Sequence, residues 1–138
     1  MGSREPLLSG PLSFWNLGDF RGKMIFGFKE KDFSTIFLPD LNAAILNILQ
    51  RRKDWSEVDV LMLAGGKEGR PGDWDKLFDR FDPGWVVVTK RNAPLNDFLK
   101  QRDIHLLALE DLGAITFRTE EAGIQVESFL KGSLLGKF

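Results

Sequence analysis

The sequence lacks cysteine and contains a single histidine, His105, among its 138 residues. Without cysteine the chain can form no disulfide and no thiolate metal site. One histidine cannot supply the clusters that usually hold a catalytic zinc ion. No apolar run approaches the roughly 20 residues that a membrane-spanning helix needs, so we expect a soluble segment that does not insert into a membrane. The formal net charge of −1 provides no global field to steer the chain toward nucleic acid or acidic lipid.

The composition that remains is that of a soluble globular protein, with 43% hydrophobic and 28% charged residues. A chain of this length is large enough for one domain with its own core. We expect residues 1–21 to be a partly flexible leader, residues 22–130 to form that single domain, and residues 131–138 to be a fraying tail. The opening residues lack the apolar core of a secretory signal.

Strand-like and helix-like patterns alternate along residues 22–130. Apolar residues at helical spacing predict helices that begin near Leu41, at Asp73 as an N-cap, and at Pro94. The β-prone runs that predict strands are 23–29, 33–38, 58–63, 85–88, 104–109, 114–118 and 124–129. This alternation predicts an α/β fold in which a mixed sheet has parallel central strands and helical crossovers.

Four cations lie in two loops that should leave the same carboxyl edge of such a sheet, where α/β folds place their sites. They are Lys67, Arg70, Lys90 and Arg91. A patch of this kind could contact a DNA backbone weakly and with strong salt dependence. The reading we favour is an ordinary solvated loop edge. The glycine-rich stretch 65–69 lacks the spacing of a P-loop, so we favour a plain turn there over an anion site.

The remaining candidates favour structural roles over chemical ones. We expect the four tryptophans to serve the core and its edges rather than as base-stacking platforms; they are Trp15, Trp55, Trp74 and Trp85. His105, at the head of an apolar strand, is predicted to be a half-buried structural residue. Glu110 and Asp111 are adjacent, so in an extended segment they would point to opposite faces rather than pair for acid–base chemistry.

Four stretches, in this order, resemble the C-terminal half of the metallo-β-lactamase-type domain of ComEC DNA-internalisation (competence) proteins. The stretches are 37–41 (Phe-Leu-Pro-Asp-Leu), 58–63 (Val-Asp-Val-Leu-Met-Leu), 82–88 (Asp-Pro-Gly-Trp-Val-Val-Val) and 111–118 (Asp-Leu-Gly-Ala-Ile-Thr-Phe-Arg). The resemblance implies half of a metallo-β-lactamase fold. It also implies a bacterial, membrane-embedded parent that moves single-stranded DNA into the cell.

The departures from this family concern its metal ligands, which in the family would bind Zn²⁺ or Mn²⁺. The family's metal-bridging carboxylate falls on Asp40, and its histidine pair falls on Gly65 and Gly66. A two-metal hydrolase needs several ligands that converge on one cavity. We therefore expect no cofactor and no catalytic residue. Asp40 is either a vestigial ligand or a helix N-cap, and we favour the cap.

Two functional hypotheses follow from the resemblance. The first is a degenerate, non-catalytic interaction or structural domain that binds another domain of the membrane-embedded parent, or single-stranded DNA weakly. The alternative is a divalent-metal-dependent nuclease or phosphodiesterase completed by a missing N-terminal half, with Asp40 as a ligand. A weaker third possibility is a small-anion sensor built on the glycine-rich loop. The sequence leans away from an enzyme.

Overall fold

The structure is a computed structural model that describes residues 12–30, 32–64, 71–120, 123–128 and 133–137. Strands and helices alternate through the middle of these ranges. The elements are β1 (Leu12–Phe20), β2 (Lys23–Glu30), β3 (Phe33–Leu38), α1 (Ala43–Gln50), β4 (Val60–Leu63), α2 (Pro71–Arg80), β5 (Trp85–Val88), α3 (Ala93–Gln101), β6 (His105–Ala108), α4 (Leu109–Leu112), β7 (Ile115–Glu120), β8 (Gly123–Ser128) and β9 (Ser133–Lys137).

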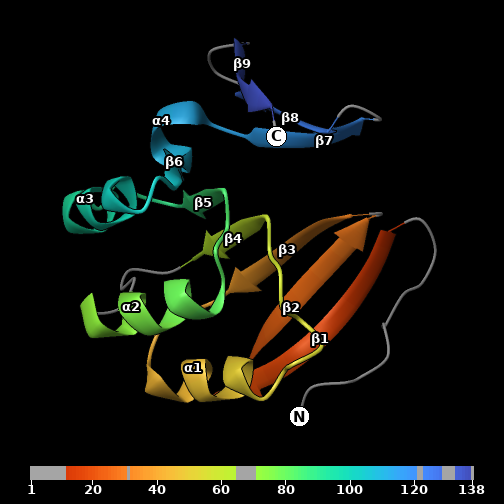
Figure 1. The fold of residues 1–138 in the computed structure, drawn as a ribbon, viewed down its shortest axis with the longest axis vertical. Coiled ribbons are helices and arrows are strands. Elements are labelled where there is room, and N and C mark those ends of the chain that lie inside the picture. Colours follow the sequence, from red (N-terminus) through yellow and green to blue (C-terminus); the bar gives the residue numbers. More distant parts are fainter. Residues whose placement is uncertain (1–11, 31, 65–70, 121–122, 129–132, 138) are drawn as a thin grey trace.

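The main sheet has six strands in the order β1-β2-β3-β4-β5-β6. Strands β1 to β3 are antiparallel, whereas β3 to β6 are parallel. Helices α1, α2 and α3 connect the parallel strands and cover one face of the sheet (Figure 1). Helical crossovers are the usual way to join parallel neighbours. The predicted α/β fold, with parallel central strands and helical crossovers, is therefore confirmed.

Two regular strands lie where the sequence predicted a leader and a tail. Strand β1 occupies residues 12–20 of the expected leader and pairs with β2, and its Leu17 is 1% exposed in the core. Strand β9, in the expected tail, pairs with β8. The sequence analysis did not predict either strand, because the short apolar stretches there gain their stability from neighbouring strands, a tertiary effect that local composition does not reveal.

The helix starts also differ from the sequence prediction. Helix α1 is capped by Asn42, whose side chain accepts a hydrogen bond from the Ile45 amide at 3.0 Å, so Asp40 is not the N-cap. Helix α2 starts at Pro71, which places Asp73 inside its first turn. Proline is favoured at the first helical position because its missing N–H has no partner to lose there. Residues 109–112 form the short helix α4 in place of a strand end.

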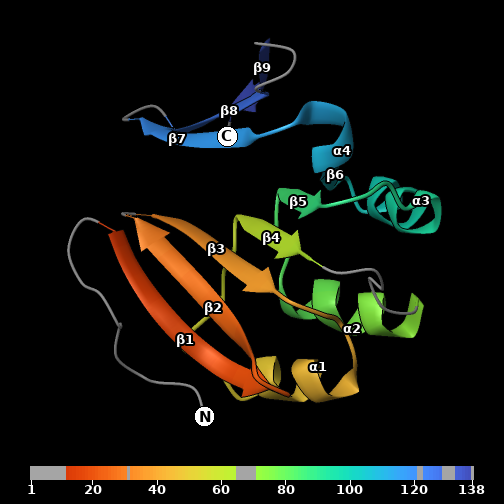
Figure 2. The same ribbon diagram turned by 180° about the vertical axis from the view of Figure 1, so that it is seen from behind.

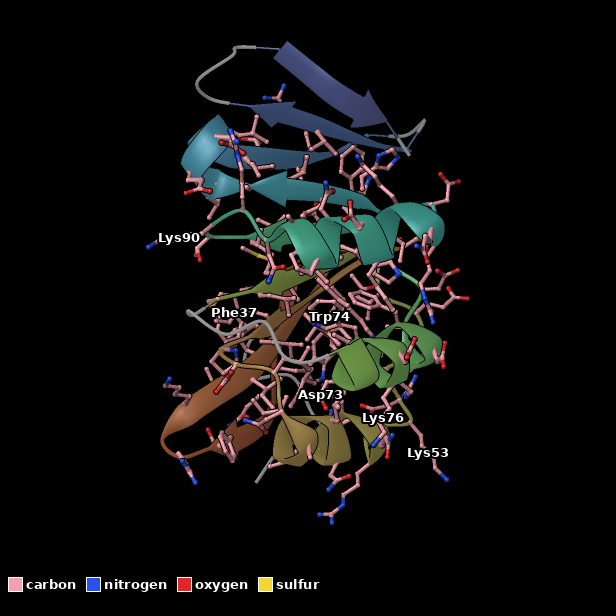
Figure 3. The ribbon with its side chains drawn as sticks, turned by 90° about the vertical axis from the view of Figure 1, so that its left-hand side faces the viewer. Phe37, Lys53, Asp73, Trp74, Lys76 and Lys90 are labelled. Carbon is pink, nitrogen blue, oxygen red and sulfur yellow. The ribbon has the colours of Figure 1, made fainter. Side chains whose placement is uncertain are left out.

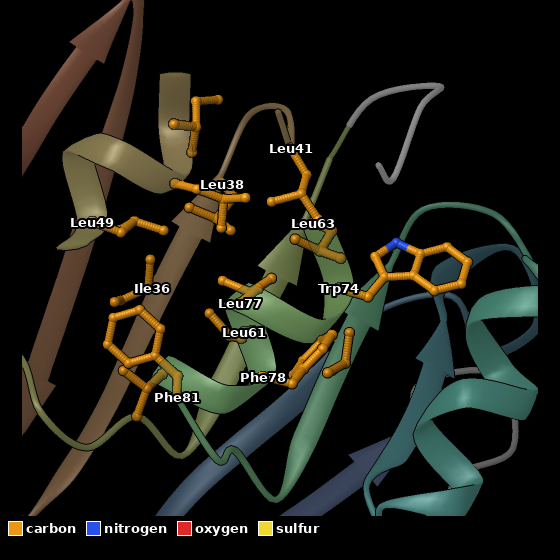
Figure 4. Packing of buried hydrophobic residues seen from close by; sticks show 14 of the residues in the cluster. Ile36, Leu38, Leu41, Leu49, Leu61, Leu63, Trp74, Leu77, Phe78 and Phe81 are labelled. Atoms are coloured by element: carbon orange, nitrogen blue, oxygen red, sulfur yellow. The ribbon is translucent and has the colours of Figure 1, made fainter. Parts of the chain in front are cut away.

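The larger core lies between the main sheet and the helices (Figure 4). Trp74, Leu77 and Phe78 of α2 are buried there, as the helical spacing predicted. Trp55 is 1% exposed in this core, whereas Trp85 is 6% exposed in a smaller core on the other face of the sheet. Trp74 is buried as well, and Trp15 packs against the edge of this core. The predicted structural use of the four tryptophans is confirmed.

A smaller core lies on the other face of the main sheet. The sheet formed by β7, β8 and β9 lies over this face on the side of β4 to β6 (Figure 2). The buried members of this smaller core are Val60, Trp85, Val87, Leu107, Leu112 and Val126. At the border of this contact, the rings of Phe33 and Phe117 stack with centroids 6.0 Å apart. No helix within the described ranges is long and apolar enough to cross a membrane.

Candidate binding surface

The carboxyl edge of the parallel strands is where the sequence placed its candidate metal ligand (Figure 3 looks onto this edge). Asp40 follows β3 there, half-buried, and its Oδ1 accepts a hydrogen bond from the amide of Leu41 at 2.8 Å. Within the part of the chain that the structure describes, no group of three or more His, Cys, Asp or Glu side chains could hold a metal ion. These described residues do not fit the two-metal site that the family resemblance implies.

Four of the predicted site residues lie outside the described residues: Gly65, Gly66, Lys67 and Arg70. Lys90 is exposed and projects from the carboxyl edge (Figure 3). Of the predicted basic patch, the structure describes Lys90 and its neighbour Arg91.

Arg91 is held by the two acidic residues of α4. Its Nε lies 2.7 Å from both carboxylate oxygens of Asp111, and its backbone amide donates to Glu110 Oε1 at 2.6 Å. The hydrogen bond that Arg91 donates to Asp111, and then the charge of that carboxylate, raise the pKa of Arg91. Together Lys90, Arg91, Glu110 and Asp111 carry no net charge. The DNA contact at this edge stays a prediction. In the described part of the edge, the positive charges of Lys90 and Arg91 are balanced by Glu110 and Asp111.

The arrangement around Arg91 corrects the prediction that Glu110 and Asp111 face apart. That prediction assumed an extended segment, whereas helical backbone in α4 lets both carboxylates reach the loop after β5.

A cavity of about 350 Å³ lies beside this ion pair, between the start of α3 and the end of β6. The side chain of Asn92, in its wall, is already used as the cap of α3, where it accepts from the Leu95 amide at 3.0 Å.

His105 lies at the opposite, amino end of the parallel strands. It is exposed, not half-buried as predicted, and its ring stacks on Trp85 with centroids 4.7 Å apart. The reason is that β6 is the last strand of its sheet, so its first residue has a neighbour on one side only. His105 and Asp40 are therefore at different ends of the sheet.

The most distinctive surface of the described chain is a cluster of rings on β1, β2 and β3. We call Phe14, Phe26, Phe28 and Phe37 the phenylalanine face. Phe26 and Phe37 are direct cross-strand partners whose rings stack with centroids 4.6 Å apart and an interplanar angle of 12°. Phe14 lies 5.4 Å from Phe26 and 5.1 Å from Phe28. These separations are those of favourable aromatic pairs.

Each ring of the phenylalanine face is partly exposed, and none belongs to either buried core. The strands turn their alternate residues, such as Ile25 and Ile36, into the helix-side core, so the phenylalanines must point to the other face. Sequence reasoning identified the strands but missed this face. The local sequence signal was the run Met24 to Phe28, which has no polar residue at alternate positions. Apolar residues on both sides of a strand indicate that both faces of the sheet are covered.

Comparisons with known proteins assign no family to this chain. No protein-family model and no curated protein sequence matches it. Among solved structures, it is similar to the crystal structure of a putative diflavin flavoprotein A 5 (fragment 1–254) from Nostoc sp. PCC 7120, with a TM-score of 0.43 and 10% identity. The match covers 94% of this chain and 62% of that chain, so this chain spans less than two thirds of its length. A likeness of this degree carries neither a family nor an activity.

Proposed function

We propose that this chain is a non-catalytic interaction domain that docks through the phenylalanine face. The partner is an apolar β-sheet face in another domain of a membrane-embedded parent of the ComEC type. The observation that carries the proposal is the continuity of this face with a sheet-on-sheet contact already present in the chain, at the Phe33–Phe117 pair.

The chemistry of the partner follows from what covers the rest of the same sheet face. Over β4 to β6, the cover is the antiparallel sheet β7 to β9. Val126 of this sheet is 0% exposed and belongs to the same buried cluster as Val60 and Val87. Stacked sheets bury their facing side chains in a layer about 10 Å thick. A second apolar sheet would extend this layer over β1 to β3.

The size of the face favours a contact within one polypeptide. A phenylalanine side chain can bury roughly 150–250 Å², and the four rings already cover part of one another. Four such side chains would bury roughly 600–1,000 Å² in full. Because each ring is already partly buried, the area still available is below the roughly 800 Å² per partner of a standard interface between separate proteins. Contacts between domains of one chain need less affinity, because the linker keeps the partner at high effective concentration.

The membrane-embedded parent in this proposal is taken from the family resemblance. The described contacts give less support to DNA binding and to a metal-dependent nuclease than to docking. Single-stranded DNA would need positive charge, and that of Arg91 is balanced by Asp111. A metal-dependent nuclease would need Asp40 as a metal ligand. The side chain of Asp40 accepts a hydrogen bond from the Leu41 amide, which is a structural role.

Site-specific photo-cross-linking in the full-length natural protein tests the proposal. Phe28 would be replaced with p-benzoylphenylalanine, and Lys76, an exposed residue on the helix side (Figure 3), would be replaced in a matched control. We expect a cross-link from position 28, absent from position 76, that peptide mapping assigns to a β-strand of the same polypeptide outside residues 12–137. No product above the control, or a product joining two copies of this domain, would overturn the proposal.

A further inference from the structure

On the helix side of the sheet, opposite the phenylalanine face, an ammonium group sits against two tryptophan rings. Lys29 Nζ lies 4.3 Å from the ring centroid of Trp55 and 5.4 Å from that of Trp15. The two rings are nearly perpendicular, at 83°, with centroids 5.4 Å apart. Both separations from the cation are within the range of cation–π attraction. We infer that Trp15 and Trp55 form a binding site for an alkylammonium group, in which Lys29 is the internal occupant.

The backbone of β2 explains why the tryptophans are placed so closely. Trp15 is the cross-strand partner of Gly27. A Cβ atom at Gly27 would lie 2.5 Å from the nearest carbon of the Trp55 ring. The absence of a side chain there lets Trp55 rest on the strand, directly beside Trp15. Lys29 is two residues farther along β2, so its side chain leaves the same face of the strand and reaches both rings.

The surroundings of Lys29 are acidic, which favours a cation. A cavity of about 210 Å³ adjoins the site and is lined in part by Lys29, Asp32, Asp54 and Glu57, which together carry a net charge of −2. Arg52 is ion-paired with Asp54 at 2.8 Å, and with its charge included the group is still acidic, at −1. Burial, the largest single influence, would raise the pKa of Asp54, but the hydrogen bond and charge of Arg52, a backbone hydrogen bond and the charge of Lys29 together lower it. The acidic residues set the sign of the charge, and the two aromatic rings provide the walls.

The hold on Lys29 is weak enough for an exchange of occupants. Within the described ranges, no carboxylate lies within ion-pair distance of its ammonium, so the rings are its main partners. Trp15 is only half-buried, which leaves one wall of the site open to solvent. A methylated ammonium sheds its water more easily than the primary ammonium of lysine and is the type of cation that aromatic walls select. The ligand class is therefore a quaternary or methylated ammonium.

The test uses tetramethylammonium chloride as the probe, with sodium chloride at equal ionic strength as its control. Binding would be followed by NMR through the indole N–H signals of Trp15 and Trp55 in the natural chain, in Lys29→Ser and in the matched surface variant Lys90→Ser. We expect saturable shifts with an apparent Kd at least tenfold lower in Lys29→Ser than in the other two chains. Equal affinity in all three chains, or no tetramethylammonium-specific shift in Lys29→Ser, would overturn the inference.

A second variant separates loss of the site from loss of the fold. Trp15→Leu, made in the Lys29→Ser chain, removes the half-exposed wall and leaves the buried Trp55 in place. With folding checked by urea denaturation, we expect it to weaken tetramethylammonium binding at least tenfold. Unchanged binding in this folded double variant would overturn the inference. Should Lys29→Ser not fold, Lys29→Gln replaces it under the same criteria. The site lies on the face opposite Phe28, so the cross-linking result and this one are independent.

Discussion

Two halves of one sheet face differ in what covers them. Over β4 to β6, the residues that face β7 to β9 are mainly aliphatic and buried, with Val60 and Val126 at 0% exposed. Over β1 to β3, the same face carries four phenylalanine rings that are partly exposed and pack on one another. Aliphatic side chains need a second layer to leave water, whereas clustered rings can shield part of their own surface.

This difference indicates which half carries stability and which is available for binding. Removing a side chain from the covered half opens a cavity, and its cost includes both lost burial and lost packing. Removing a ring from the phenylalanine face loses a cross-strand pair at a surface that water can refill.

The largest loss should come from the covered half. Trp85→Ala removes a side chain that is 6% exposed in the smaller core. Truncation of a buried aromatic residue costs about 3–5 kcal/mol, and we expect a decrease in the free energy of unfolding of that order by urea denaturation. A loss no greater than that of a phenylalanine-face variant would remove the distinction between the two halves.

The helix side offers a test by addition of a single methyl group. Gly27→Ala would place a Cβ atom 2.5 Å from the ring of Trp55. Overpacking of this kind costs about 1–3 kcal/mol. Gly72→Ala is the matched control, because nothing lies within 4 Å of its added Cβ and it lies in helix α2. We expect thermal unfolding to show a lower Tm for Gly27→Ala and an unchanged or higher Tm for Gly72→Ala.

A smaller loss is expected on the uncovered half. Phe37→Ala removes the stacked partner of Phe26, whose centroid is 4.6 Å away. Cross-strand pairs contribute about 0.2–1 kcal/mol each, so we expect a decrease in the free energy of unfolding of about 1 kcal/mol, measured by urea denaturation beside Trp85→Ala. A cost as large as that of Trp85→Ala would mean that the phenylalanine face belongs to the structural core.

The smallest effect should be a pH dependence at the amino end of the strands. Asp59 accepts a hydrogen bond from the Ser34 amide at 2.8 Å. Burial raises its pKa, the charges of Glu57 and Asp32 add to the increase, and the hydrogen bonds from Ser34 oppose it. Because the folded state binds this proton more tightly than the unfolded state, protonation stabilises the fold.

The contribution of Asp59 to stability should therefore grow as pH falls from its raised pKa toward the ordinary aspartate value, and it should be least favourable above the raised pKa. Asp59→Asn removes this titration. The free energy of unfolding of the natural chain minus that of Asp59→Asn should become more positive as pH is lowered through that window. A difference that becomes more negative would contradict the assignment.

The sequence predicts the α/β framework well because each middle strand and helix carries its own pattern. Trp85-Val86-Val87-Val88 is buried on both sides, and Leu77 and Phe78 recur at helical spacing. It predicts the ends poorly, since β1 and β9 are stabilised by pairing with β2 and β8. The predicted N-cap, Asp40, lies two residues before the observed cap, Asn42. Asparagine and aspartate have the same preference for this position, and Asn42 lies nearer the first turn.

The candidate site was harder to predict than the fold. Neither the ion pair between Arg91 and Asp111 nor the contact of Lys29 with Trp55 has a local sequence signal, because each joins residues about twenty or more positions apart. The phenylalanine face did have a local signal in the apolar residues of β2, which have no polar alternation. Its meaning depends on where the second sheet ends, and that is a property of the whole fold.

The most direct test of the central claim measures how accessible the phenylalanine face is in the isolated domain and in the full-length natural protein. With fluorinated phenylalanine and a soluble paramagnetic chelate, the relaxation of the Phe26 and Phe37 signals reports solvent contact at each ring. We expect strong relaxation of both signals in the isolated domain and clear protection in the full-length protein, with buried Phe81 protected in both. Equal relaxation of Phe26 and Phe37 in the two proteins would contradict it.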